Sequence, residues 1–503
     1  MTSSLRLLSS ATRVRRRCIR PLCGSLLKTA QRQTRGLVSA AELQFGQPLH
    51  ETHPHLLQPG ELTPGITALE YAQRRERIAK ALPANSIAIL SASDLKYRSG
   101  VVFYEYHQDA DFFYLTGFNE PEALAIIANH GTEGDYTFHL YVRPKDTKAE
   151  LWEGARSGIQ AAQDVFNADE VGDIANIPKI LPDIINSARH VFTDIPTTLP
   201  DASSKFNGQY LNGLAHWRAN SLPSLLQKSD KLTLHPLRKP MNELRVRKSE
   251  AEIANMRRVG KASALAFTEA MRNHFTTEKE LGAFLDYKFK LNGCDGTAYV
   301  PVVAGGRNAL SIHYVRNDDV LRDENLVLVD AGGEFGGYIA DITRTFPVDA
   351  SKKFTKAQSD LYAAVLEPQK KVVDLCHSNA NLCLDDLHRV AESSLRDNLK
   401  ALGFDMSNDA ISVLFPHHVG HHIGLDVHDA PGFSRREKLV SGMCVTVEPG
   451  VYVPDDKRWP KHFRNIGIRI EDSVCIQEEH PMVLTAEAVK EIDDIEALGQ
   501  SMT

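Results

Sequence analysis

The strongest constraint on the fold comes from two apolar runs that each contain one acidic residue. The runs are LVLVDAG, residues 326–332, and YIADITRTF, residues 338–346, separated by a short glycine-rich segment. Their composition predicts two neighbouring strands of a hairpin with a longer loop. Asp330 and Asp341 would then lie close together among Val, Ile and Ala, where two like charges repel unless a proton or a cation lies between them. A buried divalent metal satisfies both conditions.

Two further acids stand in similar apolar settings. Glu448 directly follows the run CVTV, residues 444–447, and the Pro-Gly pair after it is expected to end the strand. In IGIRIEDS, the alternation of side chains places Arg469 and Glu471 on the face opposite the isoleucines. An inward acid beside an arginine is a candidate metal ligand with a partner that orients it.

Histidine is concentrated in one short stretch of the second half. HHVGHHIGLDVHD, residues 417–429, places five histidines in thirteen positions, and neutral histidine is the commonest metal ligand. Four carboxylates with at least one imidazole suit Mn²⁺, Co²⁺ or Zn²⁺. Because four carboxylates are too many for one transition metal, they fit two metals about 3.5 to 4 Å apart, the arrangement of hydrolytic two-metal sites.

The N-terminus differs sharply in charge from the rest of the chain. Residues 1–41 contain eight Arg and one Lys but no Asp or Glu, interleaved with Ser, Thr, Leu and Ala, which is typical of a mitochondrial transit peptide. We therefore predict a transit peptide at 1–40 and a location in the mitochondrial matrix. The remaining 49 Lys and Arg stand against 64 Asp and Glu, an acidic balance that speaks against a nucleic-acid partner.

Length and residue pattern exclude other classes of protein. No apolar run approaches the ~18 to 20 residues that a membrane span requires. The seven Cys show no CxxC pair and no regular spacing, so we expect reduced thiols rather than a disulfide framework or a structural zinc site. At 503 residues the chain is too long for one ordinary core and is expected to form two or more domains.

The first domain is expected at 41–240 as an α/β unit. Its Pro- and Gly-rich start, to about residue 66, has no sustained period and is expected to be extended chain on the surface. A helix is predicted to begin near Leu69, and strand-like runs alternate with helical stretches beyond it. These runs lie at 86–90, 122–127 and 136–142.

A second domain is expected at 241–503. The segment from Pro236 to Pro240 interrupts the pattern, and Ser249 with Glu252 forms an S-x-x-E capping box that predicts a helix start. Helices then alternate with strands of period two. The later strand-like runs include MCVTVEPGVYV, residues 443–453, and IGIRIEDSVCI, residues 466–476.

Taken together, these motifs resemble the creatinase/aminopeptidase (pita-bread) family, and within it the Xaa-Pro aminopeptidases, or aminopeptidases P. The matching segments run in the same order through the second half: VDAGGEFGGYIADITRTFPV, HHVGHHIGLDVHD, TVEPGVYV and IRIEDSV. In the first half, THPHLLQPGELTPGI and EYHQDADFFYLTGF resemble the mitochondrial branch, which includes the intermediate-cleaving peptidase. The resemblance implies an α/β N-terminal domain followed by an α+β pita-bread catalytic domain.

The resemblance also implies which residues bind metal. Two divalent ions are expected, with Mn²⁺ preferred and Co²⁺ or Zn²⁺ as alternatives. The two bridging carboxylates would be Asp341 and Glu471. The five ligands implied by the motifs are Asp330, Asp341, His421, Glu448 and Glu471.

Further residues are implied in catalysis and substrate binding. Glu448 would also serve as general base and proton shuttle, and His313 and His428 would donate hydrogen bonds to the substrate carbonyl as it becomes an oxyanion. His417 and Tyr452 would line the substrate site. Arg469 would orient a bridging carboxylate, whereas His418 and His422 are expected to be structural.

The implied function is an aminopeptidase that removes one N-terminal residue from peptides or proteins and forms dimers or larger homo-oligomers. Its substrates would be presequence-processed intermediates with a bulky first residue, Xaa-Pro substrates, or both. One alternative is a prolidase-like Xaa-Pro dipeptidase. The other, of a different class, is a metal-free pita-bread module that binds peptides or histones.

The N-terminus suggests one substrate in particular. In RGLVSAA, residues 35–41, Arg35 lies two residues before a plausible cut after Gly36, which would expose Leu37. We hypothesise that the protein removes its own Leu37 and then begins at Val38.

Overall fold

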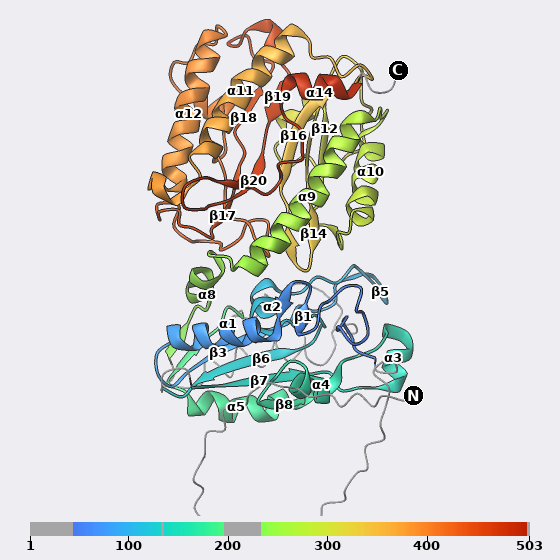
Figure 1. Cartoon of the computed structure of the whole chain (residues 1–503), viewed down its shortest axis with the longest axis vertical. Helices are drawn as coiled ribbons and strands as arrows, with labels where there is room; N and C mark the ends of the chain where they lie inside the picture. The colour runs from blue at the N-terminus through green and yellow to red at the C-terminus, as the bar shows by residue number, and fades with distance from the viewer. Residues whose placement is uncertain (1–43, 132–134, 196–232, 500–503) are drawn as a thin grey trace, which may run out of the picture.

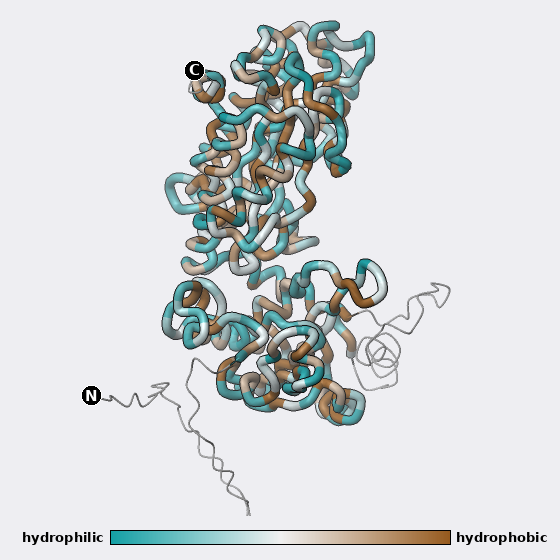
Figure 2. Tube along the Cα trace, turned by 90° about the vertical axis from the view of Figure 1, so that its right-hand side faces the viewer, coloured by the Kyte–Doolittle hydropathy of each residue, from teal (hydrophilic) through white to brown (hydrophobic). Residues whose placement is uncertain are grey.

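The computed structural model describes residues 44–131, 135–195 and 233–499, which form two lobes with helix α8 (Arg238–Arg245) between them (Figure 1). The lobes remain distinct when the molecule is turned by 90° (Figure 2). The predicted transit peptide and the hypothetical cut beside Leu37 lie outside the described residues.

The N-terminal lobe contains a six-stranded mixed sheet with the order β10-β9-β3-β6-β7-β8. The pairs β3-β6 and β6-β7 are antiparallel, and the outer pairs β10-β9, β9-β3 and β7-β8 are parallel. The strands are β3 (Ser86–Ser91), β6 (Leu124–Asn129), β7 (Tyr136–Val142), β8 (Glu170–Asp173), β9 (His190–Phe192) and β10 (Thr233–His235). The three strands predicted from the sequence are therefore present, with β6 beginning two residues late.

Helices cover both faces of this sheet (Figure 1). Alternation along β3 separates its side chains, so that Ala88 and Leu90 share a hydrophobic cluster with α1, whereas Ile87 and Ile89 share another with α5. The helices are α1 (Ala68–Ala81), α2 (Ala110–Thr116), α3 (Thr147–Glu153), α4 (Gly158–Asp164), α5 (Ile177–Ser187) and the 3-10 helix η2 (Ile174–Asn176). Two short pairs complete the lobe: β1 (Glu61–Thr63) with β2 (Ile66–Thr67), and β4 (Tyr97–Ser99) with β5 (Val102–Phe103).

The segment before α1 differs from the expected surface chain. Leu49, Leu57 and Leu62 are buried, and the Gln47 side-chain amide donates to the Gly117 carbonyl at 2.9 Å. An irregular chain with turns has no hydrophobic period, but it can still bury individual side chains.

The C-terminal lobe places its strands between two pairs of helices (Figure 1). α9 packs on α10 and on the β14-β15-β16 region, and α11 packs on α12 and on β17 and β19. The helices are α9 (Glu250–Arg272), α10 (Glu278–Leu291), α11 (Lys356–Asp374), α12 (Leu384–Ala401), α13 (Ala410–Leu414) and α14 (Ile492–Gly499), with 3-10 helices η3 (Gly306–Leu310), η4 (Ser378–Ala380) and η5 (Lys461–Phe463). The capping box at the start of α9 is present, since Glu252 N–H donates to Ser249 Oγ and Ser249 N–H to Glu252 Oε2.

The strands of this lobe form small sheets with the orders β11-β14-β15, β12-β13-β16, β17-β20-β21 and β18-β19. They are β11 (Gly296–Thr297), β12 (Val302–Gly305), β13 (Leu326–Ala331), β14 (Gly333–Phe335), β15 (Tyr338–Ile339), β16 (Ile342–Pro347), β17 (Cys444–Val447), β18 (Gly450–Val453), β19 (Ile466–Arg469), β20 (Asp472–Cys475) and β21 (Met482–Val483).

Two of the strand-like runs are each divided into two strands. Residues 443–453 form β17 and β18, and residues 466–476 form β19 and β20, because each chain leaves one sheet and enters another. β17 ends at Val447, directly before Glu448 and the Pro-Gly pair that was expected to end it, and Gly450 then begins β18. The divisions fall at Glu448 and Glu471, so both acids stand between sheets.

The boundary expected at 240 falls inside α8. Pro240 is the third residue of this helix, and a proline is tolerated in the first turn because the N–H groups there have no intrahelical partner. Within the segment from Pro236 to Pro240, Pro236 and Leu237 separate β10 from α8, and its last three residues already belong to the helix.

The two lobes pack against each other. Tyr338 and Leu425 of the C-terminal lobe belong to the same hydrophobic cluster as Tyr71 of α1. Arg74 of α1 donates to Tyr338 Oη at 3.2 Å, and Tyr338 donates in turn to Glu252 Oε1 at 3.0 Å. The two lobes are thus held together by apolar and polar contacts.

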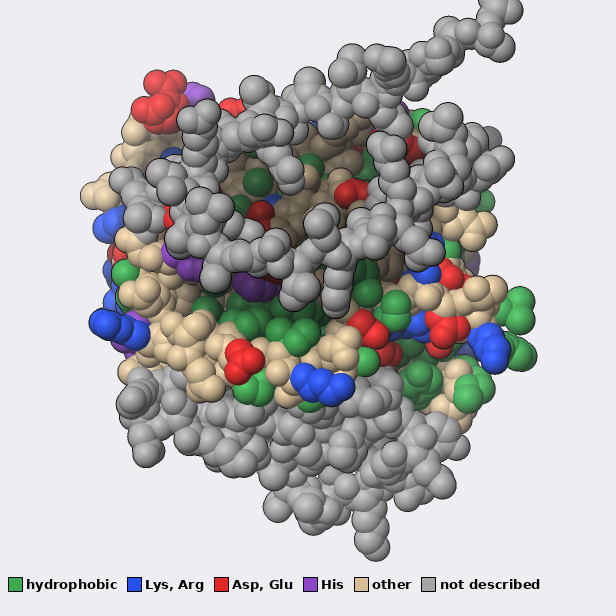
Figure 3. Space-filling model, turned by 90° about the horizontal axis from the view of Figure 1, so that it is seen from below, with side chains coloured by type: hydrophobic (Ala, Val, Ile, Leu, Met, Phe, Trp, Pro, Cys, Tyr) green, Lys and Arg blue, Asp and Glu red, His purple; other side chains and the backbone are tan. Residues whose placement is uncertain are grey.

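The part of the surface that Figure 3 shows is mixed in polarity, and the described cysteines form no disulfide. On the described part of the face seen from below, acidic, basic and hydrophobic side chains lie side by side (Figure 3). Among the described residues no helix is long and apolar enough to cross a membrane. The five cysteines in the described ranges are free thiols, all of them buried.

Candidate metal centre

Asp330 and Asp341 lie next to each other, as the two acid-bearing runs predict. β13 pairs antiparallel with β16, with Ala331 opposite Ile342, and β14 and β15 form the connection between them. Gly332 allows the chain to fold this tightly, because a Cβ there would lie 1.7 Å from the Ala340 carbonyl oxygen.

A tyrosine that sequence reasoning did not identify connects these two acids. The Tyr299 hydroxyl lies 2.7 Å from Asp330 Oδ1 and 2.6 Å from Asp341 Oδ1. Because one hydroxyl carries one proton, it can donate to only one carboxylate at a time. The pair therefore keeps negative charge that the hydroxyl does not compensate.

His421 and Glu448 lie near Asp341, on the side of the centre where β17 ends. Thr446 Oγ1 accepts from the His421 backbone N–H at 3.0 Å and donates to Glu448 Oε1 at 3.2 Å. His421 Nδ1 donates to the His422 carbonyl at 3.0 Å, which leaves Nε2 as the free ligand atom. Nε2 lies 3.4 Å from Glu448 Oε1 and 3.6 Å from Asp341 Oδ2.

Of the two carboxylate oxygens of Glu471, only one accepts a hydrogen bond from the described residues. Thr343 Oγ1 donates to its Oε2 at 2.6 Å, but Oε1 is buried and has no hydrogen-bond partner among the described residues. Ligand atoms of Asp341, His421 and Glu471 all lie within 4.8 Å of one another. This group of donor atoms is what a divalent cation requires.

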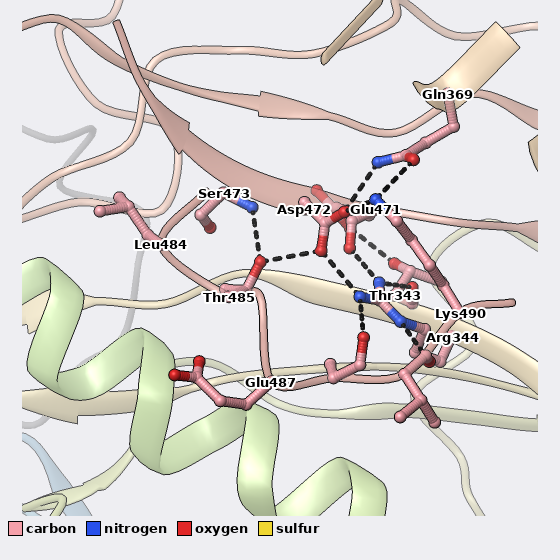
Figure 4. A network of polar contacts seen from close by, with 12 residues as sticks. Thr343, Arg344, Gln369, Glu471, Asp472, Ser473, Leu484, Thr485, Glu487 and Lys490 are labelled. Atoms are coloured by element: carbon pink, nitrogen blue, oxygen red, sulfur yellow. Dashed lines mark hydrogen bonds and ion pairs between the residues drawn. The ribbon is translucent and has the colours of Figure 1, made fainter. Parts of the chain in front are cut away.

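A buried polar network holds the backbone around Glu471 (Figure 4). The fully buried Arg344 guanidinium donates to the backbone carbonyls of Thr343 (2.9 Å) and Glu471, and to Asp472 Oδ1 at 2.7 Å. Asp472 also accepts from three other side chains. These are Gln369 (2.9 Å), Lys490 (2.6 Å) and Thr485 (2.9 Å).

Arg469 lies at the centre and contacts one of the proposed ligands directly. Its Nη2 donates to Asp330 Oδ2 at 2.5 Å and its Nε to Thr343 Oγ1 at 3.0 Å. The sequence had suggested that Arg469 orients a bridging carboxylate, Asp341 or Glu471. The guanidinium thus contacts Asp330 directly and is linked to Glu471 through Thr343, whose hydroxyl donates to Glu471 Oε2 at 2.6 Å.

His417 and Tyr452 continue this chain of contacts. Arg469 Nη1 donates to Tyr452 Oη at 2.8 Å, and Tyr452 Oη lies 2.9 Å from His417 Nε2. Burial, together with the nearby Arg469 charge, lowers the pKa of His417 to about 3. The neutral ring donates through Nδ1 to the His418 carbonyl at 2.8 Å, so its Nε2 accepts from Tyr452.

The electrostatics of the centre show an excess of negative charge. Burial raises the pKa of Glu471, and the charges of Asp341, Glu448 and Asp330 raise it further. Burial likewise raises the pKa of Glu448 to about 7, against the opposing effects of His421 and Arg469. Four carboxylates crowded around one imidazole and one guanidinium fit a pair of divalent cations, and the unpartnered Glu471 oxygen supports this fit.

His313 and His428 lie at the edge of the centre. The His428 ring packs edge-on against His421 with 4.4 Å between centroids. Burial lowers the pKa of His428, and the charges of His421 and His313 add to this effect. Both rings are exposed, so both are accessible to a substrate.

The two histidines that were expected to be structural differ in burial, since His422 is buried and His418 is exposed. His422 is buried and edge-on against Phe433, and burial with the Lys248 charge lowers its pKa to about 3. His418 packs edge-on against His388. Neither makes a contact with the carboxylates described above.

Sequence reasoning missed Tyr299, Thr343 and Arg344. Thr343 and Arg344 stand in the acid-bearing run 338–346, where a polar residue in an otherwise apolar strand is a usable signal. Tyr299 offers no such signal, because tyrosine is common in apolar segments and the nearest acid, Asp295, is not one of the candidate ligands.

Comparisons with known proteins place the chain among metallopeptidases. Residues 254–478 match the model of metallopeptidase family M24, and residues 71–192 match that of the aminopeptidase P N-terminal domain. Intermediate cleaving peptidase 55 of Saccharomyces cerevisiae is 47% identical over 91% of this chain and 89% of its own length. Human Xaa-Pro aminopeptidase 3 is 34% identical over 95% of this chain and 96% of its own length.

A solved structure extends the likeness to the fold. The crystal structure of Icp55 from Saccharomyces cerevisiae matches with a TM-score of 0.79 and 43% identity, over 88% of this chain and all of that one. Fold, ligand cluster and relatives together define a metallo-aminopeptidase, an enzyme that removes one residue from the N-terminus of its substrate. The chain belongs to metallopeptidase family M24, with an aminopeptidase P N-terminal domain and a pita-bread catalytic domain. The expected family and fold class are confirmed.

Proposed function

We propose that this aminopeptidase acts in the mitochondrial matrix and removes one bulky N-terminal residue from proteins already cut by the presequence-processing protease. The observation that carries the proposal is the close grouping of Asp341, His421 and Glu471, together with 47% identity to a relative named intermediate cleaving peptidase. A similar Arabidopsis thaliana protein, 36% identical, is named as mitochondrial. The arginine-rich residues 1–41 support the same location.

The cluster supports a site for two divalent ions, for which we propose Mn²⁺. Asp330, Asp341, His421, Glu448 and Glu471 would hold them. When bound, such ions supply a water of lowered pKa and polarise the substrate carbonyl. Oxygen-rich ligation with one imidazole suits Mn²⁺, Co²⁺ or Zn²⁺, and metal availability decides among them.

The chain's own groups then perform defined tasks. Tyr299 and Arg469 hold Asp330 in place through its two oxygens. Glu448 accepts the proton of the attacking water and passes it to the amine that leaves. His428 and His313 donate hydrogen bonds to the carbonyl oxygen as its negative charge develops, each worth roughly 3 kcal/mol in the transition state.

A cavity lined by residues of both lobes is large enough for a bulky first residue. Its volume is about 420 Å³, within the range of small-ligand pockets. Phe113, Ala298 and Leu425 give it apolar walls, and Glu334 and His107 add charge. Ala298 directly precedes Tyr299, which contacts two of the proposed ligands.

Two peptides test the substrate preference. The purified full chain, loaded with Mn²⁺, is incubated with Tyr-Ala-Ala-Ala and with Tyr-Pro-Ala-Ala, and released tyrosine is quantified. Release from the first peptide supports the intermediate-processing function, whereas release from the second alone assigns a Xaa-Pro aminopeptidase. In cells, N-termini of matrix proteins with and without this chain should differ by one bulky residue, and identical N-termini contradict the proposal.

The same preparation separates the alternatives. A prolidase-like enzyme cleaves the dipeptide Tyr-Pro but leaves the tetrapeptides intact. A binding module contains no bound metal and releases no tyrosine from any peptide, so elemental analysis of the purified chain identifies it. Chromatography with light scattering measures whether the chain forms the proposed dimer or larger homo-oligomer.

A further inference from the structure

Away from the metal centre, the guanidinium of Arg245 connects both lobes through three carboxylates. Arg245 is the last residue of α8, the helix between the lobes (Figure 1). Its Nη1 donates to Asp111 Oδ1 of α2 at 2.6 Å. Its Nη2 donates to Asp426 Oδ2 at 2.7 Å and also to Asp429 Oδ1. One side chain thus contacts the N-terminal lobe and the histidine-rich loop at once.

The contacts lie largely out of water. Arg245 is 4% exposed and Asp429 5%, and Lys248 Nζ donates to Asp429 Oδ2 at 2.7 Å. Burial opposes a charge on Asp429, but Lys248 and Arg245 outweigh it and lower its pKa to about 2. Asp429 is therefore ionised near neutral pH, and its charge-assisted hydrogen bonds are of the strong kind.

The contacts of Arg245 constrain the chain on both sides of His428. Asp426 lies two residues before His428 and Asp429 lies one residue after it, so a single guanidinium holds the chain on both sides of the ring. The backbone is also pinned, since Asp429 N–H donates to the His422 carbonyl at 2.9 Å. At Gly424 an added Cβ would lie 2.6 Å from Asp429 Oδ2, so the loop is closely packed here.

We propose that Arg245 is a positioning residue for His428, and that Asp111 makes the place of His428 depend on the N-terminal lobe. This inference rests on the proposed function only where His428 is taken to bind the reacting carbonyl. A displacement of about 1 Å in a group that contacts the reacting atoms can cost about 100-fold in rate. Loss of the Asp111 contact would let the Arg245 guanidinium shift, and loss of the Asp426 contact would release the loop before His428.

A purely structural role predicts a different outcome. An ion pair that only joins the lobes alters stability when it is broken, and it leaves the turnover of the folded enzyme unchanged. A positioning role lowers kcat in protein that remains folded and loaded with metal. It also alters the surroundings of the His428 ring.

Asp111→Asn tests the arm that reaches the N-terminal lobe. The matched control is Glu487→Gln, because both acids are 25% exposed and each pairs with an arginine, Glu487 with Arg257. In the Mn²⁺-loaded full chain, acting on whichever tetrapeptide the wild type cleaves, we expect Asp111→Asn to lower kcat about 10-fold. We expect KM and metal content to stay within twofold, and all three quantities to stay within twofold in Glu487→Gln.

A second readout does not depend on activity. Histidine labelled with ¹³C and ¹⁵N is incorporated into the full chain loaded with Zn²⁺, and His428→Gln identifies the His428 resonance. Asp111→Asn should shift that resonance, whereas Glu487→Gln should leave it in place. If wild type cleaves neither peptide, the proposed function fails, but this spectrum still decides the positioning role.

Asp426→Asn provides an independent variant on the other arm, in case Asp111→Asn does not fold. Asp426 is 44% exposed, so this change is the milder one. A fall in kcat with a shifted His428 resonance in either folded variant supports the proposal. An unchanged resonance, an unchanged kcat in an active enzyme, or an equal fall in Glu487→Gln overturns it.

Discussion

Arg469 and Asp330 form an ion pair at the metal centre, with 2.5 Å between Nη2 and Oδ2, although they lie 139 residues apart in the chain. The Arg469 side chain is 2% exposed. Its other nitrogens donate to Thr343 and Tyr452. A planar guanidinium thus orients one proposed ligand and ties it to two neighbouring groups, which a lysine ammonium cannot do in the same geometry.

We therefore expect Arg469→Lys to bind metal more weakly while keeping its charge. Loss of a group that orients a metal ligand typically costs about 10- to 100-fold in affinity. Calorimetric titration of the metal-stripped chain with Mn²⁺ measures the change. Arg257→Lys, which alters a separate ion pair with Glu487, should keep the wild-type affinity, and equal weakening in both variants would contradict the assignment.

Asp341→Asn should abolish turnover and metal content together. Asp341 lies in the group whose ligand atoms fall within 4.8 Å of one another, and the amide removes the negative charge that holds a shared cation. Elemental analysis after dialysis and a peptide assay on the same sample measure both effects. A variant that retained two metals per chain would show that Asp341 is not a bridging ligand.

His428→Ala should separate the two properties that Asp341→Asn removes together. Since the His428 ring touches His421 but is not among the proposed ligands, metal content should remain. Turnover should fall by roughly 10² to 10³, the usual effect of losing one oxyanion donor. Loss of metal in this variant would assign His428 to the ligands instead.

The stability of the buried network in Figure 4 can be tested at Asp472. Arg344 and Asp472 are 0% and 1% exposed, and Lys490 donates to the same carboxylate. Asp472→Asn leaves two cations without their counter-charge, so we expect a loss of about 3 to 5 kcal/mol in the free energy of unfolding. Urea unfolding with EDTA present excludes the contribution of bound metal.

The control for this measurement is an ion pair on the surface. Lys356 is 88% exposed and pairs with Asp360, so Asp360→Asn should change the free energy of unfolding by no more than about 1 kcal/mol. Similar losses of unfolding free energy in Asp360→Asn and Asp472→Asn would show that burial of the Asp472 network does not increase its contribution to stability.

The sequence predicted the residues of the centre whose charge differs from the apolar residues around them in the chain. Asp330, Asp341, Glu448 and Glu471 interrupt apolar runs, and a charge in such a place needs a partner. Their convergence did not follow from spacing. It depends on β13 pairing with β16 and on β17 pairing with β20, and such long-range register is not visible in either strand alone.

Other features were hidden because they depend on tertiary contacts. The division at Glu471 occurs where the chain changes sheets, and the alternation of residues 466–476 continues across it, whereas the Pro-Gly pair after Glu448 does indicate a strand end. Tyr299 and Arg245 belong to residue types that usually pack or face solvent, and only the fold brings their polar atoms to carboxylates 31 to 184 residues away.

Lys352 offers a pH-dependent test of stability away from the metal centre. It is buried, and its ammonium donates to the Pro347 and Val348 carbonyls at 3.4 and 3.3 Å. Burial lowers its pKa from 10.5 to about 8, although Asp349 and Asp323 oppose the shift. Between about pH 8 and 10.5 the unfolded chain therefore holds a proton that the folded chain has lost.

The unfolded state binds more protons than the folded state in this window. The contribution of Lys352 to the free energy of unfolding should therefore increase as the pH rises from 8 to 10.5. Below pH 8 both states are protonated, and this contribution becomes constant. Lys352→Met removes it, so the difference between wild type and variant in urea unfolding should change with pH only inside the window. The neighbouring exposed Lys353, changed to Met, should give a difference from wild type without this rise. A flat difference for Lys352→Met would mean that the folded chain keeps the Lys352 proton.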